Sequence, residues 1–204
     1  MATCLPTYMD IKKGTQFMRG EVKWASVLTP NTTFEHTFQA SIYNPIVVNN
    51  FGEVINSDSD SIIAGFEDRG FKHSVKTDKE SNEKFLFFKR KAFIKRPVPL
   101  LDEEKQPIFK NGKQEFETDE DGKWIMAVTN NDVPQLKDKD NNNIDIDIGN
   151  GSDVIVMYKE WETTHPQFGN FKGLDLAGLQ VVQLQEYNAD VGFSAVSMAE
   201  VEEF

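Results

Sequence analysis

Residues 84–96, KFLFFKRKAFIKR, constrain the fold more than any other stretch of the chain. Their polar and apolar residues alternate as in a β-strand, where successive side chains point to opposite faces. One face of an unbroken strand would carry Phe85, Phe87, Lys89, Lys91, Phe93 and Lys95. The other would carry Leu86, Phe88, Ala92 and Ile94, with Arg90 among them. The second face can close a core, so the stretch predicts a central strand of a half-buried sheet.

The face that combines aromatic rings with lysines allows two interpretations. Unpaired nucleic acid suits it, because bases stack on rings while phosphates attract nearby cations. Alternatively, this is an ordinary amphipathic strand whose lysine stems cover its own phenylalanine rings. The stretch alone does not decide between them.

The charge of the chain is unevenly distributed. Its 204 residues include 22 Lys and Arg against 33 Asp and Glu, which gives a net charge of −11. Spread evenly, that charge would disfavour phosphate binding. Residues 71–96, however, contain nine basic side chains and three acidic ones, and no Lys or Arg follows Lys172. The sequence therefore predicts a cationic surface on an otherwise acidic protein.

The cysteine content and the N-terminus indicate the compartment. Cys4 is the one cysteine, so it has no internal disulfide partner, and no Cys/His spacing suggests a zinc site. Neither a signal peptide nor an apolar run of about 18 residues is recognisable. We expect a cytoplasmic protein that is not exported and does not bind membranes.

Catalytic and metal-binding patterns are weak. The three histidines are scattered, and no nucleophile elbow occurs. A metal-dependent nuclease would use converging carboxylates such as Asp145, Asp147 and Asp153, but their pattern also describes an exposed strand edge. A calcium loop beginning at Asp138 would lack its turn glycine, since residue 143 is Asn. We predict a protein that is not an enzyme and has no cofactor.

The remaining elements suggest a mainly β fold with one helix. Strands are predicted at residues 16–28, 35–43, 84–96, 124–128, 154–161 and 177–187, with Pro45 ending the second. Ile62, Ile63 and Phe66 have a spacing that suits a helix. It is predicted over residues 59–68, capped by Ser59 or Ser61 and followed by Gly70. Loops are predicted at 71–83 and 163–172, a hairpin loop at 107–124, and a polar surface stretch at 132–143. This order indicates a single antiparallel barrel or sandwich with a capping helix.

Three segments and the C-terminus together resemble one protein family. KFLFFKRKAF, IGNGSDVIVMY and GLDLAGLQVVQLQEY occur in this order, and an acidic tail closes on Phe204. This set resembles the single-stranded DNA-binding proteins of T7-like tailed phages and their cyanophage relatives. The resemblance implies a five-stranded OB-fold with a helix between its second and third strands, a basic aromatic groove for DNA, and an acidic tail ending in an aromatic residue. The tail here is shorter and less acidic than in the best known members.

The pattern and the resemblance together predict a site and a role. We expect DNA to contact Lys23, Trp24, Lys72, Lys84, Phe85, Phe87, Lys89, Arg90, Lys91, Phe93, Lys95, Arg96, Tyr158, Lys159, Trp161, Phe171 and Lys172. The domain would span residues 1–187, and residues 188–204 would form a flexible tail. Partner proteins would bind its Glu200, Glu202, Glu203 and Phe204.

The expected function is sequence-tolerant coating of single-stranded DNA during phage replication, recombination and repair in the cytoplasm of the infected bacterium. The tail would recruit a polymerase, helicase or primase of phage or host, and a homodimer is left open. The alternative is a non-enzymatic structural or virion β-domain protein.

Overall fold

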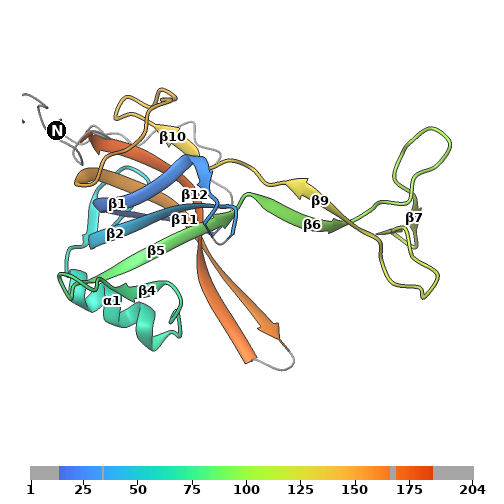
Figure 1. The fold of residues 1–204 in the computed structure, drawn as a ribbon, viewed down its shortest axis with the longest axis horizontal. Helices are drawn as coiled ribbons and strands as arrows, with labels where there is room; N and C mark the ends of the chain where they lie inside the picture. Colours follow the sequence, from blue (N-terminus) through green and yellow to red (C-terminus); the bar gives the residue numbers. More distant parts are fainter. Residues whose placement is uncertain (1–13, 34, 166–168, 186–204) are drawn as a thin grey trace, which may run out of the picture.

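A curved sheet forms the body of the protein in the computed structural model, which describes residues 14–33, 35–165 and 169–185 (Figure 1). Its long strands are β1 (Thr15–Asn31), β2 (Thr37–Val48), β5 (Lys84–Lys91), β11 (Ser152–His165) and β12 (Gly169–Gln183). The short strands β3 (Val54–Asn56), β4 (Val75–Thr77) and β10 (Gln135–Lys137) extend it. None of the helices formed by the described residues is long and apolar enough to cross a bilayer.

The strand order is that of an OB-like barrel. The sheet runs β10-β12-β11-β1-β2-β5-β4, and the long strands pair antiparallel. Side chains close the remaining gap between β5 and β12, where the Arg90 guanidinium donates to the Asp175 carboxylate at 3.1 Å. Nearby, the Phe88 ring meets the Tyr158 ring edge-on, at 5.1 Å between centroids. For the residues that the structure describes, the prediction of a mainly β, OB-fold-like barrel with one helix is confirmed.

The core lies inside this barrel and follows the period of two expected of strands. Ile42 on β2, Leu86 on β5, and Val154 and Val156 on β11 are all buried within it. The other face of β11 is buried as well, in a smaller cluster that contains Ile155. Val154 and Val156 thus lie on the opposite face of β11 from Ile155.

The helix α1 (Ser59–Asp68) has the predicted bounds and lies between the second and third long strands. Its N-cap is Asp58, whose carboxylate accepts a hydrogen bond from the Ser61 backbone N–H, so the predicted serine caps are wrong. At the other end Gly70 has φ +88°, and its N–H donates to the Glu67 carbonyl. A left-handed glycine just past the last turn is a common helix stop.

Three predicted boundaries are wrong, namely the end of the second strand and the extents of two loops. Strand β2 continues through Pro45 because the β1–β2 register shifts there, and Asn44 has φ 48°. A bulge tolerates a residue without an N–H donor. The predicted loop at residues 163–172 is instead largely the end of the β11–β12 hairpin. Likewise, the expected surface stretch 132–143 includes β10, whose Leu136 is buried.

The predicted strand over residues 84–96 is divided between two sheets. Strand β5 ends at Lys91, and β6 (Phe93–Pro97) pairs with β9 (Met126–Asn130) in a separate two-stranded ribbon. This ribbon projects from the barrel (Figure 1) and carries β7 (Phe109–Lys110) and β8 (Lys113–Gln114) beyond it. We call residues 93–130 the arm. Asn111 and Gly112 both have positive φ, as in the turn of a tight hairpin, so the predicted hairpin within 107–124 is present.

Candidate nucleic-acid interface

The face of β1, β2 and β5 that points away from the core carries several of the candidate side chains. In the β2–β5 register, the core pairs Ala40–Phe88 and Ile42–Leu86 alternate with Gln39–Lys89 and Ser41–Phe87. Phe87 and Lys89 consequently lie on the face directed away from the core. We call this the outer face.

A groove of about 610 Å³ lies where the outer face meets the β11–β12 hairpin. We call it the hairpin groove. Residues from β4, β5, β11 and β12 and from the segments before β2 and β4 line it, so sequence-distant elements converge there. They are Glu35, His73, Ser74, Lys76, Phe87, Lys89, Lys91, Trp161, Phe171, Lys172, Gly173 and Leu174.

Aromatic rings form part of the walls of this groove. Trp161 is 45% exposed, and its indole lies against Gly173, where an added Cβ would come within 2.5 Å of the ring. The imidazole of His73 stacks on Phe171 with 5.8 Å between centroids and 25° between planes. The Lys76 ammonium lies 5.1 Å from the centre of the Phe87 ring. Rings and cations thus alternate at distances suited to stacking and to cation–π contact.

Carboxylates partly neutralise the lysines of the hairpin groove. The Glu35 carboxylate accepts a 2.8 Å hydrogen bond from Lys89 and lies 3.9 Å from the Lys91 ammonium. The hydrogen bond from Lys89, with the charges of both lysines, holds the pKa of Glu35 below its usual range. At the other wall Lys172 lies 3.6 Å from Glu162. Exposed pairs of this kind are weak, so a phosphate can replace the carboxylate as the anion.

A second groove, of about 670 Å³, lies over β1 and β2 and is lined by Trp24, Gln39 and Asn150 among others. We call it the Trp24 groove. Gln39 lines this groove, and its register partner Lys89 lines the hairpin groove. The two grooves therefore adjoin at one cross-strand pair. Together they form a path over β1, β2 and β5, which we call the outer track.

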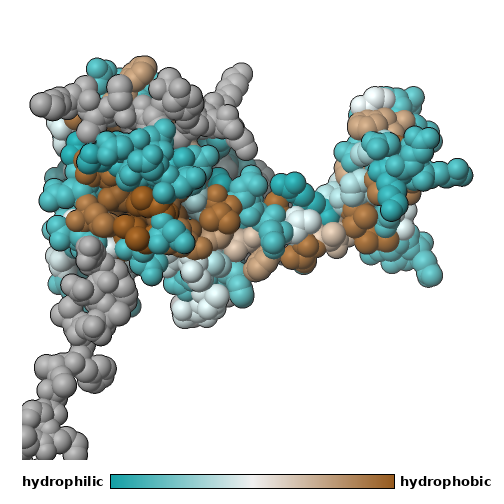
Figure 2. Space-filling model, turned by 90° about the horizontal axis from the view of Figure 1, so that it is seen from above, coloured by the Kyte–Doolittle hydropathy of each residue, from teal (hydrophilic) through white to brown (hydrophobic). Residues whose placement is uncertain are grey.

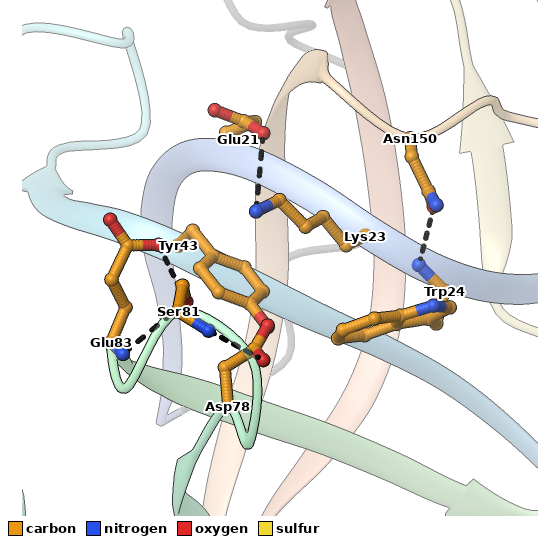
Figure 3. Close-up of polar contacts among 8 residues, drawn as sticks. All are labelled: Glu21, Lys23, Trp24, Tyr43, Asp78, Ser81, Glu83 and Asn150. Atoms are coloured by element: carbon orange, nitrogen blue, oxygen red, sulfur yellow. Dashed lines mark hydrogen bonds and ion pairs between the residues drawn. The ribbon is translucent and has the colours of Figure 1, made fainter.

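An irregularity in β1 positions Trp24 on this track (Figure 3). Trp24 has φ 51°, and its backbone N–H donates to the Asn150 side-chain oxygen at 2.8 Å. The β1–β2 register shifts beyond Lys23, which a regular strand would not do. As a result the indole is 51% exposed.

Buried rings support Trp24 from below. Tyr43 stacks on Phe85 with 4.8 Å between centroids, and Trp24 meets Tyr43 at 6.1 Å. The Lys23 ammonium lies 4.0 Å from the centre of the Tyr43 ring. The Tyr43 hydroxyl donates to Asp78 at 2.8 Å, and burial, reinforced by this bond, raises the pKa of Tyr43 (Figure 3).

Three predicted contact residues are buried or largely buried, each for a clear physical reason. Phe85 is 7% exposed beneath Tyr43 and Trp24, so it supports a ring instead of stacking on a base. Tyr158 is buried in the core, where burial raises its pKa. The side chain of Arg90 is 13% exposed and pairs with Asp175, so it is committed to closing the barrel.

The other predicted residues divide into two groups. Trp24, Phe87, Lys89, Lys91, Trp161, Phe171 and Lys172 line the outer track, with Lys23 beside Tyr43. The other six lie off the track. Phe93, Lys95 and Arg96 belong to the arm, and Lys84 pairs with Glu67. Lys72 is exposed after α1, and Lys159 lines a separate pocket beside Asp175. The tail residues Glu200, Glu202, Glu203 and Phe204 lie outside the described residues.

Sequence reasoning missed His73, Lys76 and Tyr43. Lys76 belongs to the basic stretch 71–96, which could have indicated it, and β4 brings it beside Phe87. No signal in the sequence pointed to His73 or Tyr43.

The carboxylates considered for metal binding have other roles or stay apart. Asp153 accepts hydrogen bonds from Arg19, and Asp138 accepts bonds from the backbone N–H groups of Asp140 and Asn142 within a turn. Within the ranges that the structure describes, no three His, Cys, Asp or Glu side chains converge as metal ligands would.

No family model and no curated protein sequence matches this chain. Among solved structures, gp2.5, a single-stranded DNA-binding protein encoded by bacteriophage T7, matches with a TM-score of 0.49 and 12% identity over 93% of this chain and 98% of that one. The single-stranded DNA-binding protein from bacteriophage Enc34, in its C-terminal truncation, matches with a TM-score of 0.47 and 8% identity over 87% and 90%. Its complex with single-stranded DNA matches with a TM-score of 0.45 and 8% identity over 86% and 89%. All three are phage single-stranded DNA-binding proteins, the class that the sequence resembles.

Proposed function

We propose that the protein binds single-stranded DNA along the outer track without sequence preference. The observation that carries this proposal is the alternation of accessible rings with lysines over five strands, β1, β4, β5, β11 and β12. Trp24, Phe87, Trp161 and Phe171 supply the rings, and Lys76, Lys89, Lys91 and Lys172 supply the cations. A base stacked on such a ring contributes about 1–3 kcal/mol, and every base has a face that can stack.

The same arrangement favours unpaired strands over duplex. Bases can reach Trp24 and Trp161 only with a face free, which a base-paired stack does not offer. A sequence-reading protein commonly inserts a helix into the major groove. Here α1 carries Asp60, Glu67 and Asp68, whose charges repel phosphate. The track therefore suits a flexible strand bound through its backbone and its ring faces.

A titration of the protein with oligo-dT and with duplex DNA at several salt concentrations tests this proposal. We expect tight, strongly salt-dependent binding to oligo-dT and weak binding to duplex. The double variant K89A/K91A should flatten the plot of log affinity against log salt by roughly 0.7 for each phosphate that is no longer neutralised. The matched control K110A/K113A removes the same charge from the far end of the arm and should leave the slope unchanged. If both double variants show the same slope of log affinity against log salt, DNA does not bind at Lys89 and Lys91.

Magnesium added to the same assay separates the other classes. Binding without cleavage is the expected result for a protein that is not an enzyme. Cleavage would indicate a nuclease, and the absence of binding would favour the structural or virion β-domain.

The wider role follows from the same site and the sequence of the C-terminus. We propose that the protein coats exposed strands during phage replication, recombination and repair in the cytoplasm of the infected cell. A domain over residues 1–187 would bind the DNA, and the segment 188–204 would act as a tethered competitor. That segment has four acidic side chains and no basic one, so it is attracted to the same lysines as phosphate.

Two variants separate the two roles proposed for this segment. Deleting residues 198–204 removes Glu200, Glu202, Glu203 and Phe204, and should tighten binding to single-stranded DNA severalfold at low salt. It should also abolish capture of the replicative polymerase, helicase or primase. F204A keeps the charge but removes the apolar anchor, so it should lose capture while its DNA affinity stays the same. A truncated protein with unchanged affinity and unchanged capture contradicts both roles.

A further inference from the structure

The arm exposes apolar side chains on one face of its ribbon, beside Lys95. Val128 is 64% exposed, and Phe93 and Met126 are exposed on the same face of the ribbon. Figure 2 shows apolar surface along the arm where it stands away from the body. A two-stranded ribbon is only marginally stable in water by itself, and an exposed apolar patch of this kind marks an interaction surface.

The two edges of the ribbon differ in chemistry. Strand β6 carries Lys95, Arg96 and Pro97, and such residues discourage pairing with a further strand. Strand β9 reads MAVTN, without charge or proline, and the whole stretch 124–131 is uncharged. The β9 edge therefore has none of the usual protection against strand addition.

The hydrogen bonds of the ribbon show which backbone groups point outward. The N–H of Val98 donates to the Ile125 carbonyl, and the N–H of Asn131 donates to the Ala92 carbonyl. In an antiparallel pair only alternate residues face the neighbouring strand. The even-numbered residues Met126, Val128 and Asn130 therefore direct their N–H and C=O groups away from β6. Among the described residues β9 pairs with β6 alone.

We infer that β9 pairs antiparallel with β9 of a second copy, about a two-fold axis centred on Val128. The product is a four-stranded sheet in the order β6-β9-β9-β6. The charges favour β9 as the place where a second copy binds. Each chain has a net charge of −11, so two copies repel each other over most of their surface, but β9 is neutral and allows them to approach there. A partner protein that binds through charged side chains would find no opposite charges on β9.

The flanking charges favour the antiparallel direction. Lys123 precedes the neutral stretch and Asp132 follows it. Antiparallel pairing about Val128 brings Lys123 of each copy near Asp132 of the other, whereas parallel pairing would bring like charges together. Both copies also contribute Met126 and Val128 to one face of the new sheet. The contact is small, so the dimer is reversible.

Sedimentation equilibrium of the full chain without DNA tests the inference. We expect the mass to rise with concentration from 23.2 kDa towards twice that value. V128P removes an outward N–H that the ribbon does not use, so it should keep the fold and weaken the dimer at least tenfold. V128T keeps the shape and the N–H, and should dimerise as the parent does. A parent that stays monomeric, or a V128P protein that dimerises equally well, overturns the inference.

Cysteine cross-linking tests the same contact in the C4S background, which has no other thiol. Directly opposite residues in an antiparallel pair lie within disulfide range. V128C should therefore form dimers at least tenfold faster than T129C, whose side chain is also exposed but which faces Ala127 of the other copy. Equal rates would indicate random collision and contradict the pairing. Neither experiment includes DNA, so its outcome is independent of the proposed function.

Discussion

The indole of Trp161 lies across the backbone of Gly173, its register partner on the opposite strand of the β11–β12 hairpin. A Cβ on Gly173 would come within 2.5 Å of the ring, so only glycine lets the indole lie flat there. The position of Trp161 in the hairpin groove thus depends on the absence of a side chain across the hairpin.

The variant G173A should therefore displace Trp161 while leaving the fold intact. We expect a shift in tryptophan emission and a loss of oligo-dT affinity close to that of W161A, about 1–3 kcal/mol for one stacked base. In a W161A background the G173A change should cost nothing further. Additive losses would mean that Gly173 acts without the indole.

Glu35 competes with phosphate for Lys89 and Lys91, so E35Q should raise the affinity for oligo-dT severalfold at low salt. Because the pKa of Glu35 lies below its usual value of 4.5, the carboxylate is still ionised at pH 5, and the difference from the parent protein should persist there. The control E67Q removes the partner of Lys84, which lies outside both grooves, and should leave the affinity unchanged. Binding isotherms in low salt measure both variants.

Breaking the pair that closes the barrel should destabilise the fold without affecting DNA binding. D175N leaves the Arg90 guanidinium without its carboxylate, and we expect a loss of roughly 1–3 kcal/mol in the free energy of unfolding. The exposed pair between Arg69 and Glu160 is the control, since E160Q should cost at most about 1 kcal/mol. Urea unfolding measures both losses. If D175N changes the salt dependence of DNA binding, Arg90 contacts phosphate, as the sequence predicted.

Two tyrosines should resist ionisation in alkali. Burial raises the pKa of both Tyr43 and Tyr158, so their neutral forms are favoured in the folded protein. A raised pKa contributes stability that is complete below the ordinary value of about 10 and is lost as the pH rises above it. Ultraviolet absorbance during a pH titration should show their ionisation only as the protein unfolds. Y43F and Y158F should each remove part of this late signal, and an unchanged signal would contradict the assignment.

Bound DNA should quench two of the three tryptophans. Trp24 and Trp161 line the outer track, whereas Trp124 lies in the arm, so oligo-dT should quench the first two. W24F/W161F retains only Trp124 and should show almost no quenching. Strong quenching in that variant would remove both indoles from the site.

Regular elements were predictable because their periodicity is local. Within Lys84–Lys91 the alternation separates Leu86 and Phe88 from Phe87 and Lys89, and the structure places the first two in the core and the other two on the outer face. The helix bounds followed from apolar spacing and from Gly70, although the cap is Asp58. In these cases the residues that determine the structure are close neighbours in the chain.

The errors arise where distant segments or irregular backbone decide the outcome. Phe85 is on the predicted face, but Tyr43 and Trp24 from two other strands cover it. Tyr158 shares a face with Val154 and Val156, and the sequence of β11 does not reveal which of its two apolar faces meets the main core. The change of sheet at Ala92 likewise depends on partners, since β2 pairs with one side of the break and β9 with the other.

The chain leaves the barrel and returns to it at almost the same point. Ala92 and Asn131 are joined by a 2.7 Å backbone hydrogen bond, and the Asn131 side chain donates to the Lys91 carbonyl. The residues between them form an insertion, and the core residues of the barrel lie outside it. Such a junction lets evolution lengthen, shorten or exchange the appendage without refolding its host, and it offers protein engineers a ready site for inserting a foreign domain.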